Sequence, residues 1–454
     1  MKIPCMTRLP FIVTGLSFVQ SELTGIQFYN LTLIATALVL GSKFNLTQIS
    51  RMWLKEKCVS TLSHFMSDAK FSTYEMQRLY IEQALLMYNI KKRKGFFVID
   101  DTMQHHTKFC KWIHGVFVLF DHAMGTNVKS VCIVFLYYTN GDEIKFVIDF
   151  RIFYKETNEM LWRRDKRHHH KTKYELAVEM LELALKRGFP KSTVLADSWF
   201  GIEPFIKELR RLHLSYVLEI KDSYTIRQPC KEPKLTPTGK LAKNQYDTIK
   251  LPLFFQTISS FTKYGFEAEK QAGKEKKSLY HTKVITGRLN AIKGKHRIVE
   301  SIDQRKKSVK YLVTNELSWE TTMIISVYSY RWVIEEFFRN AKQLSDMEGA
   351  TIRSEPGVTL SLCLVSWIDF LLHLENYKQR TAGKLTKDSL TIPSIVRQAQ
   401  YSNLKALLDR LEKDETFVQK WLNLEKKHIE KKRKKHKQLI EIDNQDEILL
   451  DLAA

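Results

Sequence analysis

Two short apolar runs, each followed directly by an aspartate, constrain the fold of this chain most strongly. The run Phe-Phe-Val-Ile at 96–99 leads into Asp100 and Asp101, and the run Val-Leu-Ala at 194–196 leads into Asp197. Both runs have the length and the branched or aromatic content of buried β-strands. A carboxylate at the end of a buried strand is costly unless it has a partner, and a metal ion is a common one. For each acid taken alone, a turn or a helix N-cap is the alternative.

The order of the expected elements indicates a fold class. Strands are predicted at residues 96–100, 116–120, 131–138, 145–153, 193–196 and 216–220. Asn140-Gly141 is a hairpin turn between the third and fourth strands, and a helix is expected over 173–186. Antiparallel strands followed by alternating helices and strands are typical of a ribonuclease H-like α/β domain with a mixed sheet.

Three regions are expected along the chain. Residues 1–90 are predicted to be helical and to bind DNA, with a plain helical bundle as the alternative. Residues 91–375 form the α/β domain, interrupted at 222–308 by a polar, Lys-rich and β-rich insertion in which 251–255 resembles a strand. Residues 376–454 are predicted to be basic and helical, and their lysine run is either a solvated helix face or a phosphate-contacting arm.

A long helix is expected over 320–344. At about 100° per residue, Tyr328, Arg331, Glu335 and Lys342 share one stripe of it. Most of the neighbouring residues are apolar, so the helix is expected to be packed and its polar stripe to face a cleft. In such a stripe the carboxylate can bind a cation, and the guanidinium can bind phosphate oxygens.

The charge balance narrows the class of partner. The 454 residues include 72 Lys and Arg against 50 Asp and Glu, a formal net charge of +22. This excess favours a polyanionic partner, with nucleic acid as the first candidate and a ribosomal or membrane-surface role as the alternative. No CxxC pair occurs among the six cysteines, which argues against a zinc knuckle or dithiol site and fits a reduced cytosol. The apolar run at 31–40 is too short for a membrane span of about 20 residues, so a soluble protein is expected.

Three carboxylates suit a site for two Mg²⁺ ions. Magnesium prefers oxygen ligands and keeps several waters, so few protein ligands suffice. Two such ions about 3.5–4 Å apart can activate an attacking oxygen and stabilise a leaving one in phosphoryl transfer. Asp100 and Asp101 are adjacent in a strand and project to opposite faces, so only one of them can reach the ions.

Here the sequence resembles a known family. The spacing Tyr328-x2-Arg331-x3-Glu335-x6-Lys342 resembles the YREK signature of DDE-type bacterial insertion-sequence transposases, in the fourth-numbered insertion-sequence family. The words Ile-Asp-Asp-Thr at 99–102 and Val-Leu-Ala-Asp-Ser-Trp-Phe-Gly at 194–201 resemble the first and second aspartate motifs of that family. The resemblance covers residues 90–375.

The resemblance implies a site and a reaction. The catalytic and metal-binding residues would be Asp101, Asp197 and Glu335, since the family pattern places Thr directly after the catalytic Asp. Tyr328, Arg331 and Lys342 would contact DNA. The implied activity is cut-and-paste DNA transposition with two Mg²⁺ ions, for which Mn²⁺ can substitute.

The resemblance also implies partners and a setting. The partners would be double-stranded DNA, at the terminal inverted repeats of the element and in the target, and a second copy of the chain in a homodimer. The setting would be the prokaryotic cytoplasm, at the nucleoid when DNA is bound. Two other functions stay open: a catalytically silent DNA-binding protein derived from a transposase, and a structure-selective nuclease on the same fold.

Overall fold

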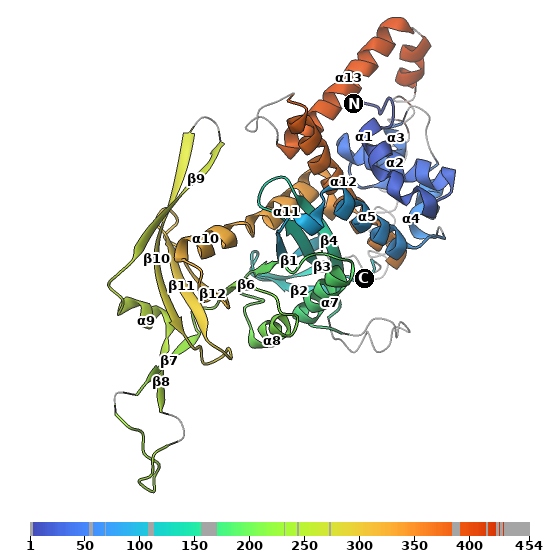
Figure 1. Ribbon diagram of the computed structural model, residues 1–454. Coiled ribbons are helices and arrows are strands. Elements are labelled where there is room, and N and C mark those ends of the chain that lie inside the picture. The colour runs from blue at the N-terminus through green and yellow to red at the C-terminus, as the bar shows by residue number, and fades with distance from the viewer. Residues whose placement is uncertain are drawn as a thin grey trace, which may run out of the picture.

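The structure is a computed structural model of mixed α/β architecture, built around one large sheet with helices packed against it (Figure 1). It describes residues 3–430, apart from 54–57, 69, 108–112, 156–169, 231, 243–244, 272–273, 384–390, 415, 424–425 and 427–429, and it does not describe the side chains of 264–279. Much of the lysine run near the C-terminus lies outside the described residues.

The large sheet has ten strands. Its order is β2 (Phe117–Asp121), β3 (Thr126–Thr139), β1 (Phe96–His106), β5 (Thr193–Ala196), β6 (Tyr216–Ile220), β12 (Val309–Thr314), β11 (His296–Asp303), β10 (Lys274–Gly287) and β9 (Thr262–Gln271), with β4 (Lys145–Phe153) also paired to β3. Strand β3 pairs antiparallel with both β1 and β4, whereas β1, β5 and β6 run parallel to one another. The strand segments expected from the sequence between residues 96 and 220 are all present.

Local sequence explains several of these boundaries. The turn between β3 and β4 contains Gly141, whose φ of 87° favours glycine. Helix α7 (Lys173–Lys186) begins after Thr172, which forms a reciprocal capping box with Glu175. Two expectations were wrong. The segment 251–255 is not a strand but part of helix α9 (Leu251–Gln256), which has a proline in its first turn, and β1 is longer than expected.

The N-terminal region is helical and packs around one long helix. It contains α1 (Pro10–Gly15), α2 (Gly25–Val39), α3 (Leu46–Arg51), α4 (Val59–Ser67) and α5 (Thr73–Met87). Helices α1, α2, α4 and α5 contact α12 (Glu355–Thr381), where Tyr80 packs edge-on against Phe370 with ring centroids 5.2 Å apart. Helix α12 is long and apolar enough to cross a membrane, but 89% of its most apolar window is buried inside the protein, as in a core helix.

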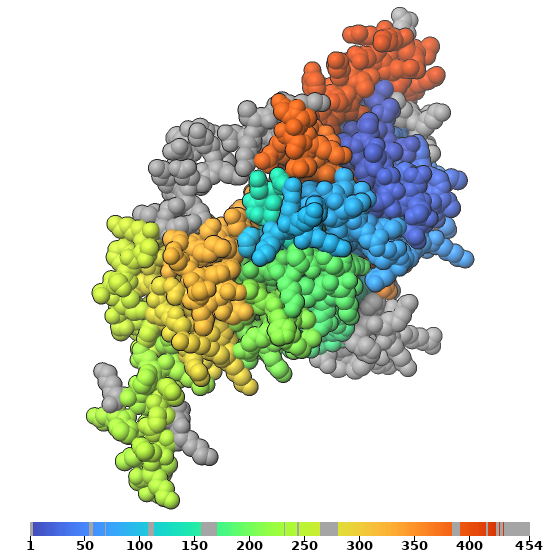
Figure 2. All heavy atoms as spheres, viewed as in Figure 1, coloured from blue at the N-terminus to red at the C-terminus, as the bar shows by residue number. Residues whose placement is uncertain are grey.

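The insertion extends the sheet of the core. Strand β12 pairs antiparallel with β6, and β11, β10 and β9 follow in order. A separate pair of strands, β7 (Thr225–Pro229) and β8 (Tyr246–Lys250), projects away from the rest of the molecule (Figures 1 and 2). The insertion is therefore joined to the core through main-chain hydrogen bonds.

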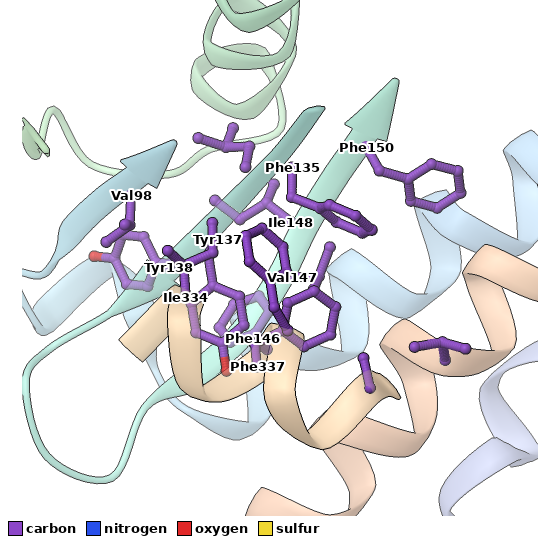
Figure 3. Packing of buried hydrophobic residues seen from close by; sticks show 14 of the residues in the cluster. Val98, Phe135, Tyr137, Tyr138, Phe146, Val147, Ile148, Phe150, Ile334 and Phe337 are labelled. Carbon is purple, nitrogen blue, oxygen red and sulfur yellow. The ribbon is translucent and has the colours of Figure 1, made fainter. Parts of the chain in front are cut away.

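Two helices cover one face of the core strands. These are α10 (Thr321–Ser329) and α11 (Trp332–Leu344), and α13 (Ile392–Lys413) follows α12 near the C-terminus. Figure 3 shows Ile334 and Phe337 of α11 pointing toward aromatic side chains of β3. The ring of Phe337 lies 5.2 Å from that of Phe135 and 5.5 Å from that of Tyr137. This contact fixes the position of α11 on the sheet.

Phe337→Ala should destabilise the protein by about 3–5 kcal/mol, because it removes a buried ring and leaves a cavity. Urea unfolding would measure the loss. A matched control on the same helix is Trp332→Ala, because Trp332 is 57% exposed, and its effect should stay within about 0.5 kcal/mol. Equal losses in the two variants would contradict this account of how α11 is held.

A buried acid and a buried histidine lie together on α12. The Oδ1 atom of Asp369 is 3.7 Å from Nε2 of His373, and the hydroxyl of Tyr137 donates to Oδ2 of Asp369 at 3.0 Å. Burial raises the pKa of Asp369 from 3.8 to about 7 and lowers the pKa of His373 from 6.5 to about 3. Both side chains are therefore neutral in the folded protein near pH 5.

Between pH 3.8 and 6.5, unfolding releases the proton of Asp369 and adds one to His373, so their effects on stability cancel. In the wild type, the protonated Asp369 contributes to the free energy of unfolding, and this contribution falls as pH rises. Asp369→Asn removes it. Relative to the wild type, its unfolding free energy should therefore rise with pH by up to about 1.4 kcal/mol per unit. His373→Gln should show the opposite relative slope. Urea unfolding at several pH values in this window tests both, and slopes parallel to the wild type would refute the assignment.

Candidate active site

Three acids lie side by side across three neighbouring strands. Strands β1 and β5 are parallel with Ile99 opposite Ala196, and β6 continues the same register. Asp197 directly follows the last residue of β5, so the register continued by one residue brings Asp100, Asp197 and Glu219 level with one another. Residues that are level in a parallel sheet project to the same face. The sheet therefore assembles a row of carboxylates from acids that are distant in the chain.

The fourth acid comes from the helices above this face. The sequence predicts one helix over 320–344, but the structure has two, which meet at Tyr330. Tyr328 lies in the last turn of α10, Arg331 is the N-cap of α11, and Glu335 lies in the first turn of α11. The junction lies where the ring of Tyr330 stacks on that of Phe96, with centroids 5.0 Å apart. The predicted polar stripe is thus divided between two helices.

Arg331 joins the helix acid to a strand acid. Its Nη1 donates to Oδ2 of Asp100 at 2.7 Å, and its Nη2 donates to Oε1 of Glu335 at 2.9 Å. The side chains of Arg331 and Asp100 are 13% and 12% exposed. Removing one member of a pair buried to this degree leaves an uncompensated charge, which is strongly destabilising. The guanidinium therefore holds α11 over the row of acids.

The crowding of acids is visible in their pKa values. Burial and the negative charge of Asp197 raise the pKa of Asp100 to about 7, although Arg331 opposes the rise. Burial also raises the pKa of Asp197, and Arg331 again opposes it. The single guanidinium thus neutralises only part of the negative charge of these acids. A further cation would favour their ionised forms.

Asp101 lies on the opposite face of β1. Its Oδ2 accepts a hydrogen bond from Nζ of Lys173 at 2.9 Å and a weaker one from the Cys132 thiol at 3.4 Å. Lys173 is the first residue of α7, and its Nζ also lies 4.9 Å from the ring centre of Trp199. The structure therefore pairs Asp101 with α7, and Asp100 with α11.

Four of these acids, Asp100, Asp101, Asp197 and Glu335, line one cavity of about 440 Å³. Its lining residues are Asp100, Asp101, Thr102, Asp197, Arg331, Glu335, Phe338, Arg339 and Lys342. The structure thus brings Asp101, Asp197 and Glu335, the three acids expected from the sequence, to the same cavity, together with Arg331 and Lys342.

The donor set of this cavity fits a hard divalent cation, because carboxylate oxygens are the ligands that Mg²⁺ prefers. Among the residues that the structure describes, no three Asp, Glu, His or Cys side chains are already gathered as ligands of one ion. Arg331 lies between Asp100 and Glu335 instead. Binding of a cation between these two acids would require the guanidinium to leave at least one of them.

Two residues expected to contact DNA have protein partners. The hydroxyl of Tyr328 donates to Oε2 of Glu219 at 2.7 Å, and the side chain is buried. The Nζ of Lys342 forms an ion pair with Glu348 at 2.8 Å and donates to the carbonyl of Met103 at 3.4 Å. Lys342 lines the cavity, whereas Tyr328 is not among its lining residues.

Sequence reasoning missed Glu219. The available signal was a single charged residue inside the apolar strand at 216–220, but only the register with β5 reveals its neighbour Asp197. The loop after Asp197 packs against the same strand, because a Cβ on Gly201 would lie 2.1 Å from the carbonyl oxygen of Glu219. Glycine is therefore required at this close approach.

The histidines singled out by the sequence contribute little here. Nε2 of His105 lies 2.7 Å from Oδ2 of Asp121, and burial lowers the pKa of His106. His168 and His169 lie outside the described residues.

Comparisons with known proteins add two family matches. The model described as "DDE superfamily endonuclease" matches residues 30–252, and that described as "Transposase DDE domain" matches residues 164–371. No curated protein matches the chain. Among solved structures, the NurA nuclease from Sulfolobus solfataricus is 10% identical, with 68% of this chain and 95% of that chain covered. Its TM-score is 0.23, which is too low to support a conclusion about this chain.

Proposed function

We propose that this chain, which the two DDE family matches support as a transposase-type nuclease, cuts DNA at the ends of a mobile element and joins the freed ends to target DNA. The observation that carries the proposal is the single cavity in which Asp197, Glu335 and the pair Asp100 and Asp101 meet cationic side chains. The net charge of +22 favours a polyanionic substrate.

The fold supports the same proposal. The order β4, β3, β1, β5, β6, with three antiparallel strands followed by two parallel ones, agrees with that expected of a ribonuclease H-like domain. We therefore extend the proposal to that fold and to the YREK family, on the spacing of Tyr328, Arg331, Glu335 and Lys342. A homodimer that bridges two DNA ends, in the prokaryotic cytoplasm, belongs to the same proposal.

The acids have a clear chemical role in this function. Asp197 and Glu335, with one of the two adjacent aspartates, would hold two Mg²⁺ ions, which supply activation of the attacking oxygen and stabilisation of the leaving one. Mn²⁺ would substitute. Arg331 balances the acids when DNA is absent, and its planar guanidinium suits two phosphate oxygens equally well. Lys342, at the wall of the cavity, would contact the DNA backbone near the cut.

The family motif and the geometry of the site favour different aspartates as the metal ligand. The spacing to Thr102 favours Asp101. The geometry favours Asp100, because it is level with Asp197 and shares Arg331 with Glu335, whereas Asp101 is paired with Lys173. Both residues line the cavity, so the question is which of the two side chains faces the ions.

The activity is tested with linear DNA that carries the element ends. With Mg²⁺, the wild type should produce cut ends and joined products, and removal of the metal by a chelator should abolish both. Asp197→Asn should lower cutting by at least about 1,000-fold while DNA binding persists. Binding without cutting in the wild type would favour the silent DNA-binding protein, and cutting without joining would favour the nuclease.

Paired variants decide between the aspartates. If Asp100 is the metal ligand, Asp100→Asn should abolish cutting, whereas Asp101→Asn should retain most of it and lose mainly the contact with Lys173. If Asp101→Asn abolishes cutting and Asp100→Asn retains it, the metal ligand is Asp101. Lys173→Gln is the matched control, because it breaks the Asp101 pair without removing an acid. Metal-dependent cutting in a time course is the measurement.

A further inference from the structure

We infer that Glu219 is a positioning residue of this site, which holds the Tyr328 hydroxyl and thereby fixes the junction of α10 and α11 that carries Arg331 and Glu335. The inference rests on the proposed function, since it concerns the geometry of the same acids. Glu219 lies outside the YREK and aspartate motifs, and it acts through another side chain instead of contacting the substrate.

Strand register places Glu219 beside Asp197, at the border of the site. Strand β5 pairs with β6 with Ala196 opposite Leu218, so the next pair along is Asp197 and Glu219. The carboxylate of Glu219 therefore extends the row formed by Asp100 and Asp197. The backbone of Glu219 is also fixed from the other side by the close approach of Gly201, in the loop that follows Asp197.

The contacts of Glu219 distinguish it from the candidate metal ligands. Its Oε2 accepts from the Tyr328 hydroxyl at 2.7 Å and from Nζ of Lys310 at 2.5 Å. The Lys310 ammonium also lies 5.7 Å from the centre of the Tyr328 ring. One carboxylate oxygen thus has two donors from different elements. Glu219 is also not among the residues that line the cavity, whereas the candidate metal ligands are. Its place therefore suits a structural anchor better than a metal ligand.

The bond between Glu219 and Tyr328 lies close to the junction of α10 and α11. Tyr328 lies three residues before Arg331 and seven before Glu335, and the helix breaks between them. Three side chains attach the junction to the sheet: Tyr330 stacks on Phe96, Tyr328 bonds to Glu219, and Arg331 bonds to Asp100. Loss of the Tyr328 bond loosens the start of α11, where Arg331 and Glu335 lie, while Phe337 still packs against the sheet. A displacement of about 1 Å at a reacting group can cost about 100-fold in rate.

The test compares Glu219→Ala, Glu219→Gln, Tyr328→Phe and the double variant Glu219→Ala/Tyr328→Phe in the full chain. Mn²⁺ binding without DNA is measured by calorimetry, and metal-dependent cutting is measured with saturating DNA. Glu219→Ala should weaken Mn²⁺ binding and lower the cutting rate by about 10–100-fold, with little change in KM for DNA. Glu219→Gln keeps an oxygen acceptor for the tyrosine and should recover most of both losses. Tyr328→Phe should match Glu219→Ala, and the double variant should be no worse than either.

The matched control is Glu203→Gln, a carboxylate of similar exposure that pairs with Arg210 away from the cavity. It should leave Mn²⁺ binding unchanged. Additive losses in the double variant, or wild-type Mn²⁺ binding in Glu219→Ala, would overturn the inference while the proposed function stands. A wild type that binds Mn²⁺ but does not cut DNA would overturn the proposed function. The Mn²⁺ affinities of the variants would still show whether Glu219 acts through Tyr328. A wild type that binds no Mn²⁺ would overturn both.

Discussion

The parallel pairing of β1, β5 and β6 is the constraint on which the rest of the site depends. Main-chain hydrogen bonds set which residues are level, and a slip of one residue would turn every side chain of a strand to the other face. Asp100, Asp197 and Glu219 share a face because three strands keep one register. Part of the negative charge that accumulates there is neutralised by Arg331, which binds Asp100 of this row and Glu335 of α11.

The apolar packing of α11 complements this register. Phe337 on one side of the helix packs against Phe135 and Tyr137, while Glu335 on another side reaches the cavity. A helix with an apolar face and a polar face can thus be held firmly and still present a carboxylate. Strand β1 is divided in the same way: Asp100 contacts α11 through Arg331, and Asp101 contacts α7 through Lys173. The site is therefore positioned by regular elements, and its acids need no long flexible loop.

Much of this could be predicted from the sequence, and the omissions have physical reasons. The strands that begin at residues 96 and 193 and the helix at 173–186 follow from apolar runs and capping signals, and they were confirmed. The predicted end of the first strand at Asp100 was wrong, because β1 continues to His106. The break at Tyr330 was missed because it depends on a contact with Phe96, which lies more than 200 residues away. The segment 251–255 was wrongly predicted as a strand because a short apolar run fits either structure. The position of Glu219 beside Asp197 follows from strand pairing, which local sequence does not encode.

The pairing of β6 with β12 has a consequence for the architecture. The chain leaves the core at the end of β6 and returns at the start of β12, and these two ends are adjacent, with Ile220 opposite Tyr311. A tight hairpin of a few residues would join them equally well. The pairing of β6 with β12 therefore does not itself require the segment between them. That segment is held to the core by further contacts, such as that of His296 Nε2 with the Tyr216 hydroxyl at 2.8 Å. The strands that align the acids, β1, β5 and β6, lie outside this segment, so the insertion enlarges the sheet at one side without interrupting them.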